Sequence, residues 1–593
     1  MTTRRTARVG AALVLVSAVL LSAACGVPNS SGVQYIRPGP EGGSTLESGG
    51  SPPPLPDDAT TKEDLVENFL QAAAGSPDTA ADRVRQYLRQ SDQDGWQPDD
   101  EILVIRLHQD PFFTDDPAGG WLVQLDAQPV GELHPNGYLD PPSSAEPVEI
   151  RFRVTAEGAP DGQVNGDPLR LRIADPPPFL LLADTALAND NYYYPNPIYF
   201  WDPDHQVLVP DLRWLPLAGE SVEQHPWTVI RWLLAGPAPE LSRVEGLPAG
   251  TQHMGLPVWD DQRLVVNFNG AAIEGRPGAT DLATQLAWSM PQLREGAELE
   301  LRIDDRPQDV RPRPRPEPAE PVRFVVLDGI VYRYGEPGVA FPPVLDGSVN
   351  TGLLAAAVAG HGEVAALIRA APEGGQRLTI ARGRPGSDPV EQPTALRAER
   401  IGQPVWLGSG GVLTGLVVAD GELYRFTSTG DVSQVEVSGL SGAIDAIAVA
   451  PERRRLALVA GGRLYLAQLR HDRVSVTLQA PRSLPTRVGN LTGVAFTHDI
   501  QLVVAGELDN RVGLHRITVD GGVEEQLYDL SNATVTTLVG HASRDHTDLP
   551  VLMYEANGQA YTFTGIASLV QPDQLADPPD SADSPPRAPF FLG

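Results

Sequence analysis

Hydrophobic and polar residues alternate along this chain with two different periods, and the changes of period mark its parts. Near residue 65 apolar side chains recur every three or four positions, as Leu65 and Phe69 do, which predicts an amphipathic helix. Thr60 and Glu63 have the spacing of a capping box at its start. Helices followed by antiparallel strands predict a small α+β domain over residues 60–185. A second helix is expected after Pro77, and strands are expected at 102–107, 121–125, 148–154 and 169–173.

Residues 190–308 again mix the two periods and predict a second α+β domain. An aromatic run at 192–194 opens it. We interpret this run as a strand that enters a core, because dense exposed aromatic side chains are unfavourable, and a ligand-stacking face is the alternative. The pattern then predicts a strand at 198–201, a second at 207–210, a helix from about 226 to 236, a strand at 264–268, a helix at 282–290 and a strand at 299–303. Residues 309–321 alternate Pro with charged residues and predict a stiff, extended linker.

From residue 322 to residue 570 the pattern consists of short apolar runs separated by turns that contain Gly, without a long helix. The runs repeat at a spacing of roughly 43 to 49 residues, which is the span of one four-stranded propeller blade. We therefore expect a β-propeller of five or six blades, with an array of β-sandwiches as the alternative. The repeat is marked by Ala357, Trp406, Ala448, Ala495 and Val539.

Two segments have compositions that cannot bury enough apolar surface to fold. Residues 25–59 are rich in Gly, Ser and Pro and predict a flexible tether. Residues 571–593 are rich in Pro and Asp and predict a disordered tail. The apolar end of that tail, at 590–592, has no explanation in this pattern.

The chain begins with an export signal. A basic start is followed by an uncharged apolar run at 9–21 and by small residues at 22–24. The run is too short to cross a hydrocarbon layer of about 30 Å, so residues 1–24 are expected to be a cleaved signal peptide. Cys25 follows directly, and the segment resembles a bacterial lipobox, in which this thiol is diacylated, although Ser22 stands where Leu is usual. An ordinary secretory signal with an incidental cysteine is the alternative.

Charge and cysteine content exclude several classes of function. The chain has 76 acidic and 45 basic residues, a net charge of −31, and such a field repels nucleic acid and anionic surfaces. Nucleic acid is therefore excluded as a partner. One cysteine in the whole chain excludes a disulfide framework and a thiol nucleophile beyond the lipidated position.

A search for catalytic motifs yields no candidate site. Residues 439–443 come closest to a nucleophile elbow but depart from it at the last position. Among the histidines, His541 and His546 lie near Asp545 and Asp548, and we interpret this cluster as a solvated loop rather than a metal site. The sequence therefore predicts no catalytic residue, no cofactor and no metal, and it leaves Cys25 as the only candidate site residue.

Resemblances to two known families add to these predictions. Residues 190–308 resemble the GerMN domain of spore-germination and lipoprotein families in the segments 233–237, 247–251 and 264–268, although Asn267 stands where that family often has Asp. The whole order of parts resembles the LpqB family of actinobacterial lipoproteins, and in the first domain segments 63–74, 85–88 and 96–98 carry the likeness. The resemblance implies an accessory lipoprotein of the MtrA–MtrB two-component system that binds the extracytoplasmic domain of the MtrB sensor kinase.

The expected function is therefore a non-enzymatic regulator, anchored by Cys25 at the extracytoplasmic face of the cell membrane, that modulates signalling in envelope and division control. The alternative is a protein that binds or hydrolyses envelope polysaccharide in the propeller funnel. Hydrolysis would require carboxylates about 5 to 10 Å apart facing the central channel.

Overall fold

The computed structural model describes residues 50–593 except 143–145, 158–169, 336–339, 360–361, 409–411, 472–474, 480 and 532. The expected signal peptide, Cys25 and most of the expected tether lie outside the described residues. Within the described part of the chain, no helix is both long enough and apolar enough to cross a bilayer.

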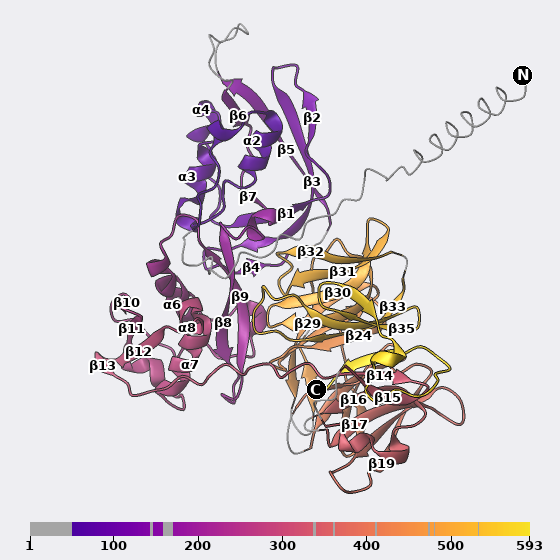
Figure 1. Cartoon of the computed structure of the whole chain (residues 1–593). Coiled ribbons are helices and arrows are strands. Elements are labelled where there is room, and N and C mark those ends of the chain that lie inside the picture. The colour runs from indigo at the N-terminus through magenta and orange to yellow at the C-terminus, as the bar shows by residue number, and fades with distance from the viewer. Residues whose placement is uncertain are drawn as a thin grey trace, which may run out of the picture. The chain divides into compact units, whose positions relative to one another are not determined.

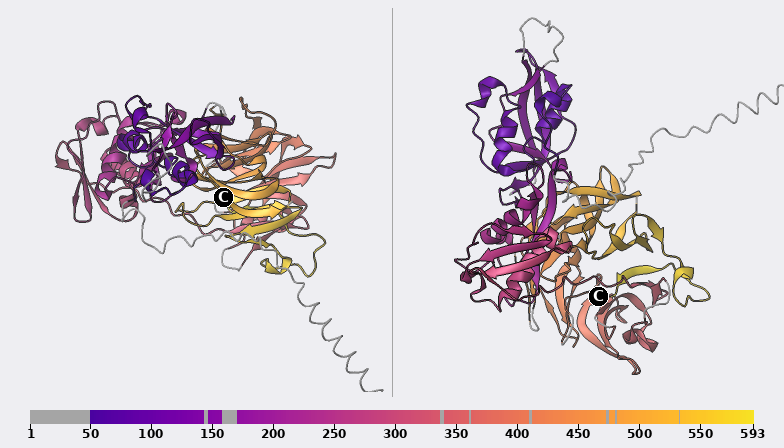
Figure 2. Two further views of the ribbon diagram at one scale, coloured as in Figure 1. Left: turned by 90° about the horizontal axis from the view of Figure 1, so that it is seen from above. Right: turned by 60° about the vertical axis from the view of Figure 1, so that its left-hand side comes forward.

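The first domain packs three short helices, α2 (Lys62–Phe69), α3 (Ala80–Arg85) and α4 (Gln90–Gln93), on one face of a sheet (Figures 1 and 2). The sheet order is β6-β5-β3-β1-β7, with β7 parallel to β1 and the other pairs antiparallel. The ring of Phe69 lies 5.3 Å from that of Phe152 on β5, which fixes α2 to the sheet. All four predicted strands are present. The strands are β1 (Ile102–Leu107), β2 (Phe112–Asp115), β3 (Trp121–Leu133), β4 (Leu139–Asp140), β5 (Val148–Glu157), β6 (Arg170–Ala174) and β7 (Leu180–Ala183), followed by helix α5 (Asp184–Leu187).

The start of this domain differs from the prediction in two ways. The capping box is one residue later than expected, because Thr61 caps α2 and Asp64 completes the box. Residues 50–59 were expected to belong to the tether, but Pro53 and Pro56 are buried and the Tyr87 hydroxyl donates to the carbonyl oxygen of Pro54. The prolines can pack against the domain because they lose little conformational entropy when they become fixed.

The second domain begins with a long hairpin formed by β8 (Tyr193–Trp201) and β9 (Leu208–Pro216). Tyr192 is 6% exposed and Tyr193 is 3% exposed, which confirms that the aromatic run enters a core. The helices α6 (His225–Ala235), α7 (Ala279–Ser289) and α8 (Pro291–Arg294) pack on a separate sheet whose order is β10-β11-β12-β13. Its strands are β10 (Val258–Asp260), β11 (Arg263–Phe268), β12 (Glu298–Ile303) and β13 (Arg306–Pro307).

The segment expected to be a linker, 309–321, contains neither helix nor strand. Two arginines nevertheless fix it to the folded parts. Arg313 forms an ion pair with Asp281 of α7 at 2.6 Å, and Arg315 forms one with Asp499 of the propeller at 2.7 Å.

The propeller contains six sheets in the described part of the chain, which confirms the predicted fold and sets the number of blades at six. Five sheets have at least four strands in sequence order, and the sixth has the order β15-β14-β37. In chain order, the propeller strands of residues 323–483 are β14 (Arg323–Leu327), β15 (Ile330–Tyr334), β16 (Leu353–Ala359), β17 (Val364–Ala370), β18 (Gln376–Arg382), β19 (Val390–Ala398), β20 (Val405–Trp406), β21 (Thr414–Ala419), β22 (Glu422–Thr427), β23 (Val432–Gln434), β24 (Ile444–Val449), β25 (Arg455–Ala460), β26 (Arg463–His471), β27 (Val476–Leu478) and β28 (Arg482–Ser483). The remaining strands are β29 (Gly489–His498), β30 (Gln501–Leu508), β31 (Arg511–Thr518), β32 (Glu524–Ser531), β33 (Val535–His541), β34 (Val551–Ala556), β35 (Gln559–Phe563), β36 (Ala567–Leu569) and β37 (Arg587–Phe591).

The repeat markers explain how the blades are arranged. Ala357, Trp406, Ala448, Ala495 and Val539 lie in β16, β20, β24, β29 and β33, which are the first strands of the five sequential sheets. β16 contacts β20, β21 of the same sheet contacts β24, β24 contacts β29, β29 contacts β33, and β37 contacts both β33 and β16. The six sheets therefore form a closed ring, which excludes the alternative of a β-sandwich array.

The expectation of a disordered tail is wrong for the end of the chain. Residues 587–591 form β37, which pairs antiparallel with β14, so that the last strand of the chain completes the sheet of the first propeller strands (Figure 1). Phe590 is 2% exposed and its ring stacks on that of Phe324 at 5.1 Å. The apolar end at 590–592 thus closes the propeller, and this pairing offsets the low hydrophobicity of the residues before it.

Candidate functional site

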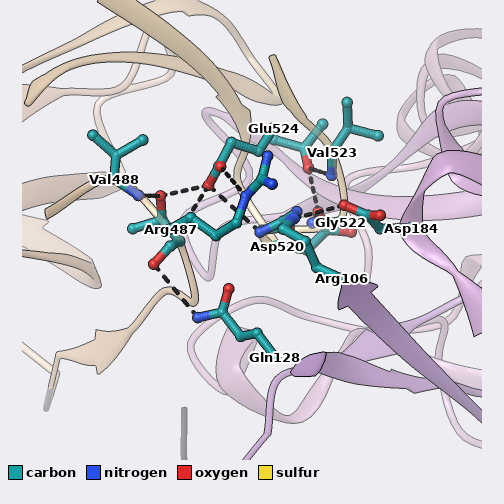
Figure 3. A network of polar contacts seen from close by, with 12 residues as sticks. Arg106, Gln128, Asp184, Arg487, Val488, Asp520, Gly522, Val523 and Glu524 are labelled. Atoms are coloured by element: carbon teal, nitrogen blue, oxygen red, sulfur yellow. Dashed lines mark hydrogen bonds and ion pairs between the residues drawn. The ribbon is translucent and has the colours of Figure 1, made fainter. Parts of the chain in front are cut away.

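A buried polar network joins the first domain to the propeller, and Arg106 of β1 lies at its centre (Figure 3). Its Nε donates to Oδ2 of Asp184 at 2.6 Å, and its Nη2 donates to the carbonyl oxygen of Gly521 at 3.0 Å. Its Nη1 lies 3.5 Å from Oε2 of Glu524. The side chains of Arg106 and Glu524 are 2% and 1% exposed, so this ion pair is shielded from water.

Glu524 stays ionised in this buried position because several donors surround it. Burial alone would raise the pKa of its carboxyl group, but the charge of Arg106, the Thr486 hydroxyl and Arg487 outweigh it and hold the pKa below its ordinary value. The Thr486 hydroxyl donates at 2.6 Å, and the backbone N–H of Arg487 donates at 3.0 Å. The carboxylate therefore has the partners that a buried charge requires.

The turn between β31 and β32 fits against the hairpin of the second domain. The indole N–H of Trp214 on β9 donates to Asp520 at 2.8 Å, and the Thr518 hydroxyl and the Gly522 N–H hold the other oxygen of the same carboxylate. A Cβ atom at Gly522 would lie 2.9 Å from the Trp214 ring and 3.1 Å from the Leu139 side chain. The absence of a side chain at residue 522 is therefore required for this contact.

Apolar packing surrounds the network. One continuous core cluster includes Leu139 of the first domain, Trp214 of the hairpin, and Val488 and Ile517 of the propeller. Charged, polar and apolar contacts thus coincide, which indicates that these parts form one packed unit rather than domains joined only by a linker.

A second polar contact joins the hairpin and the linker segment to the propeller. Asp499 accepts a hydrogen bond from the Tyr199 hydroxyl at 2.8 Å and pairs with Arg315 at 2.7 Å. Burial would raise the pKa of Asp499, but Arg315, His498 and Tyr199 lower it below its ordinary value. A third contact pairs Asp202 with Arg454 at 2.7 Å.

The structure brings together part of the histidine and aspartate cluster, because Nδ1 of His546 lies 3.6 Å from Oδ1 of Asp545, but the His546 side chain is only 15% exposed and does not belong to a solvated loop as expected. The His546 ring packs against Tyr194 at 5.3 Å, whereas the His541 ring packs against Phe591 at 5.6 Å. Burial and the nearby His498 lower the pKa of His546 to about 4, although Asp545 opposes the shift. Among the described residues, no group of three or more His, Cys, Asp or Glu side chains is placed to hold a metal ion.

A cavity of about 290 Å³ marks the central channel of the propeller, and residues of all six first strands or their flanks line it. Its carboxylates are Asp445, which is exposed, and Glu555. Glu555 accepts hydrogen bonds from the Thr536 hydroxyl at 3.2 Å and the Ala588 N–H at 2.7 Å. The channel therefore contains polar groups, and one of its two carboxylates is already engaged within the protein.

The second domain exposes apolar side chains along one sheet edge. Met254, Leu256 and Val258 are 39%, 66% and 59% exposed, and we call these three residues the edge patch. β10 is the terminal strand of its sheet, and the Met254 N–H donates to the Asn267 carbonyl oxygen, so the segment before β10 also follows this edge. An edge strand of this kind is a template for pairing with another chain.

Sequence reasoning did not identify the buried network or the edge patch. An arginine within the apolar strand that contains Arg106 was a signal for a buried ion pair, because an unpaired charge is rarely buried. The edge patch had no comparable signal, since apolar residues in a loop before a strand usually pack inward.

Comparison with known proteins gives matches in the same order as the structural parts. Family models match at residues 55–188 (Lipoprotein LpqB, N-terminal domain), 197–309 (Sporulation and spore germination) and 335–550 (Lipoprotein LpqB beta-propeller domain). The first confirms the LpqB-like first domain, and the second agrees with the GerMN-like region.

Several relatives have the name Lipoprotein LpqB. The protein from Streptomyces coelicolor is 25% identical over 93% of this chain and 94% of its own length, and the one from Nocardia farcinica is 24% identical over 86% and 87%. The protein from Thermobifida fusca is 28% identical over 40% of this chain, and the match spans 37% of that relative.

Similar solved structures include TolB from Acinetobacter baumannii, which is 13% identical over 46% of this chain and 66% of that chain, with a TM-score of 0.30. The propeller domain of Cps50 (Swd1) is 14% identical over 42% of this chain and 77% of that chain, with a TM-score of 0.27. The sheet order and the closed ring carry the propeller assignment. Because the three family models follow one another along most of the chain, and relatives with the same name match nearly its full length, this chain belongs to the LpqB family of lipoproteins.

Proposed function

We propose that this chain is a lipid-anchored, extracytoplasmic, non-catalytic binding protein that regulates a sensor histidine kinase in the same membrane. The relatives named as lipoproteins and the signal segment that ends at Cys25 support the anchor. The kinase, of the MtrB type, is the partner that the family resemblance implies, and the regulated processes are envelope and division control.

The edge patch is the observation that best supports binding to a protein partner. In the described ranges no strand neighbours the outer N–H and C=O groups of β10, and exposed apolar side chains lie around them. An extended peptide segment can add a strand to such an edge, with hydrogen bonds from its backbone and contacts from its apolar side chains. Because the chain has a net charge of −31, the expected partner segment is apolar and basic.

The buried network supports the same function in a different way. It fixes the first domain, the hairpin and the propeller to one another, so the edge patch is presented by a packed scaffold. A lipid anchor would confine that scaffold to the membrane surface, which raises its effective concentration for a membrane partner without any new contact.

The test measures binding of the full-length protein to the purified extracytoplasmic domain of the kinase. The double variant Leu256→Ser with Val258→Asp should weaken binding at least tenfold. A matched control, Ile566→Ser with Val390→Asp, changes propeller residues that are 72% and 63% exposed and should bind like the unmodified protein. Unchanged binding by the edge-patch variant, or an equal loss in the propeller control, would overturn the assignment of this edge.

The anchor is tested separately with Cys25→Ala. This variant should appear in the soluble fraction instead of the membrane, and kinase-dependent gene expression should fall. Full signalling by a completely released protein would show that the anchor is not needed for regulation, even if the edge patch binds the kinase.

The second candidate function is binding or hydrolysis of envelope polysaccharide, which the polar channel favours. Asp445 and Glu555 are the carboxylates that line it. If this function holds, Asp445→Asn should abolish binding or cleavage of purified envelope polysaccharide while kinase binding remains. Absence of any polysaccharide binding by the unmodified protein would eliminate it.

A further inference from the structure

A cavity of about 480 Å³ lies where the second domain meets the propeller blade that contains β26 and β27. Residues of the turn between β8 and β9 form one side, Arg243 and Val244 form another, and the end of β26 with Thr477 of β27 forms the rest. This volume is within the range of sites for small organic ligands. Nothing in the proposed kinase function uses this cavity.

Three arginines line the cavity, and two of them have unused donors. Arg454 is fully engaged, because it pairs with Asp202 at 2.7 Å and its Nη1 lies 3.1 Å from Nε2 of His471. Arg243 makes one hydrogen bond, from Nη1 to the Thr477 hydroxyl at 3.1 Å. Arg470 is exposed, and within the described ranges no carboxylate pairs with it or with Arg243. Among the described residues, two guanidinium groups without a carboxylate partner thus line one cavity, beside Asp202, which is paired with Arg454, and Asp204.

An independent observation points to a ligand that also carries hydroxyl groups. Gln468 lines the cavity and is 8% exposed, and its side-chain amide oxygen is buried without a hydrogen-bond partner among the residues that the structure describes. A buried amide without a partner is unfavourable by about 1–3 kcal/mol, so a ligand hydroxyl that pairs with it would be stabilised. A ligand hydroxyl could pair with the Gln468 amide in either flip state, because the amide oxygen accepts a hydrogen bond and the amide NH₂ group donates one. Val209, Val244 and Leu469 supply apolar walls for a carbon skeleton.

We infer that this cavity binds a small phosphorylated polyol. The phosphate group lies between Arg243 and Arg470, because its three terminal oxygens can accept from two guanidinium forks, as phosphate does at other arginine sites. A hydroxyl group of the ligand pairs with the Gln468 amide. Since the hairpin and the propeller both line the cavity, the bound ligand also stabilises the contact between them.

The test is calorimetric titration of the purified full-length protein with glycerol 3-phosphate, inorganic phosphate and glycerol. Glycerol 3-phosphate should bind, phosphate should bind more weakly, and glycerol alone should not bind. The double variant Arg243→Ala with Arg470→Ala should weaken glycerol 3-phosphate binding at least tenfold. Gln468→Leu should weaken glycerol 3-phosphate several-fold and leave phosphate unchanged, a difference that general loss of structure would not produce.

The matched control is Arg511→Ala, which removes an arginine of β31 whose side chain is 72% exposed. It should bind glycerol 3-phosphate like the unmodified protein. Vesicles that contain phosphatidylglycerol, added in place of the soluble compound, distinguish a lipid headgroup from a free metabolite, because only a headgroup ligand would give binding that depends on Arg243 in that arm. The inference is overturned if neither glycerol 3-phosphate nor the vesicles bind, or if Arg511→Ala loses as much affinity as the double variant.

Discussion

Arg106 and Glu524 are 418 positions apart in the sequence, yet Nη1 of the arginine lies 3.5 Å from Oε2 of the glutamate. Neither side chain is more than 2% exposed. Each of the two also has other partners, since Arg106 pairs with Asp184 and Glu524 accepts from Thr486. The contact between the first domain and the propeller is therefore built around charges that would be costly to bury alone.

Removing the arginine should strongly destabilise the protein. Arg106→Met leaves the carboxylates of Glu524 and Asp184 without their main cation, and breaking a buried pair in this way costs about 3–5 kcal/mol. Thermal unfolding should show a clearly lower melting temperature. In the double variant Arg106→Met with Glu524→Gln the charge of Glu524 is gone and only Asp184 lacks its cation, so the fall in stability should be smaller than the sum of the two single falls. Strict additivity would contradict the pairing.

Gly522 gives a test that does not involve charge. In Gly522→Ala the new Cβ meets the Trp214 ring at 2.9 Å, and forcing such a contact costs about 1–3 kcal/mol. Gly489→Ala is the matched control on the same blade, because its Cβ would have Glu507 as its nearest neighbour at 3.9 Å. The melting temperature should fall for Gly522→Ala and stay nearly constant for Gly489→Ala. An equal change in melting temperature for the two variants would contradict the close approach of residue 522 to Trp214.

The sequence predicted helices and strands well where the local pattern of apolar residues determines them. The strand at Ile102–Leu107 has the expected bounds, and the marker residues Ala448 and Ala495 lie in first strands, as a repeat of blade length requires. The prediction was wrong where a partner distant in sequence decides the structure. The segment before Phe590 has the composition of a disordered tail, but its pairing with β14 and the hydrogen bonds from Asp583 and Ser584 to Asp328 order it.

The difference between local patterns and contacts distant in sequence also explains which site residues could be predicted. Cys25 is recognised by the residues that precede it, so the sequence suffices to propose lipidation. The partners of Arg106 come from α5 and from β32, and no local pattern connects those segments. Arg243 and Gln468 meet at one cavity for the same reason, through the packing of separate domains.

Closure of the propeller by its last strand predicts a large effect at Phe590. Phe590→Ala removes a buried ring that stacks on Phe324 at 5.1 Å, and such a loss costs about 3–5 kcal/mol. The matched control is Phe112→Ala, because Phe112 is 63% exposed and its loss should change stability by about 0.5 kcal/mol or less. Limited proteolysis should cleave the Phe590 variant faster within the propeller. Equal protease resistance of the two variants would show that the last strand does not hold the ring closed.

His225 predicts how stability depends on pH. The residue begins α6, is fully buried, and has no hydrogen-bond partner at either ring nitrogen within the described part of the chain. Burial lowers its pKa to about 4 from an ordinary value of 6.5, against the smaller opposing effect of Glu223.

Between pH 6.5 and pH 4 the unfolded chain therefore binds a proton at this residue that the folded chain does not, so the free energy of unfolding falls as the pH falls. His225→Leu keeps the site apolar and removes this proton uptake. The melting temperature of the unmodified protein minus that of the variant should decrease steadily from pH 7 to pH 4.5. Parallel melting curves over that range would mean that the imidazole is protonated in the folded state, or that it is not buried.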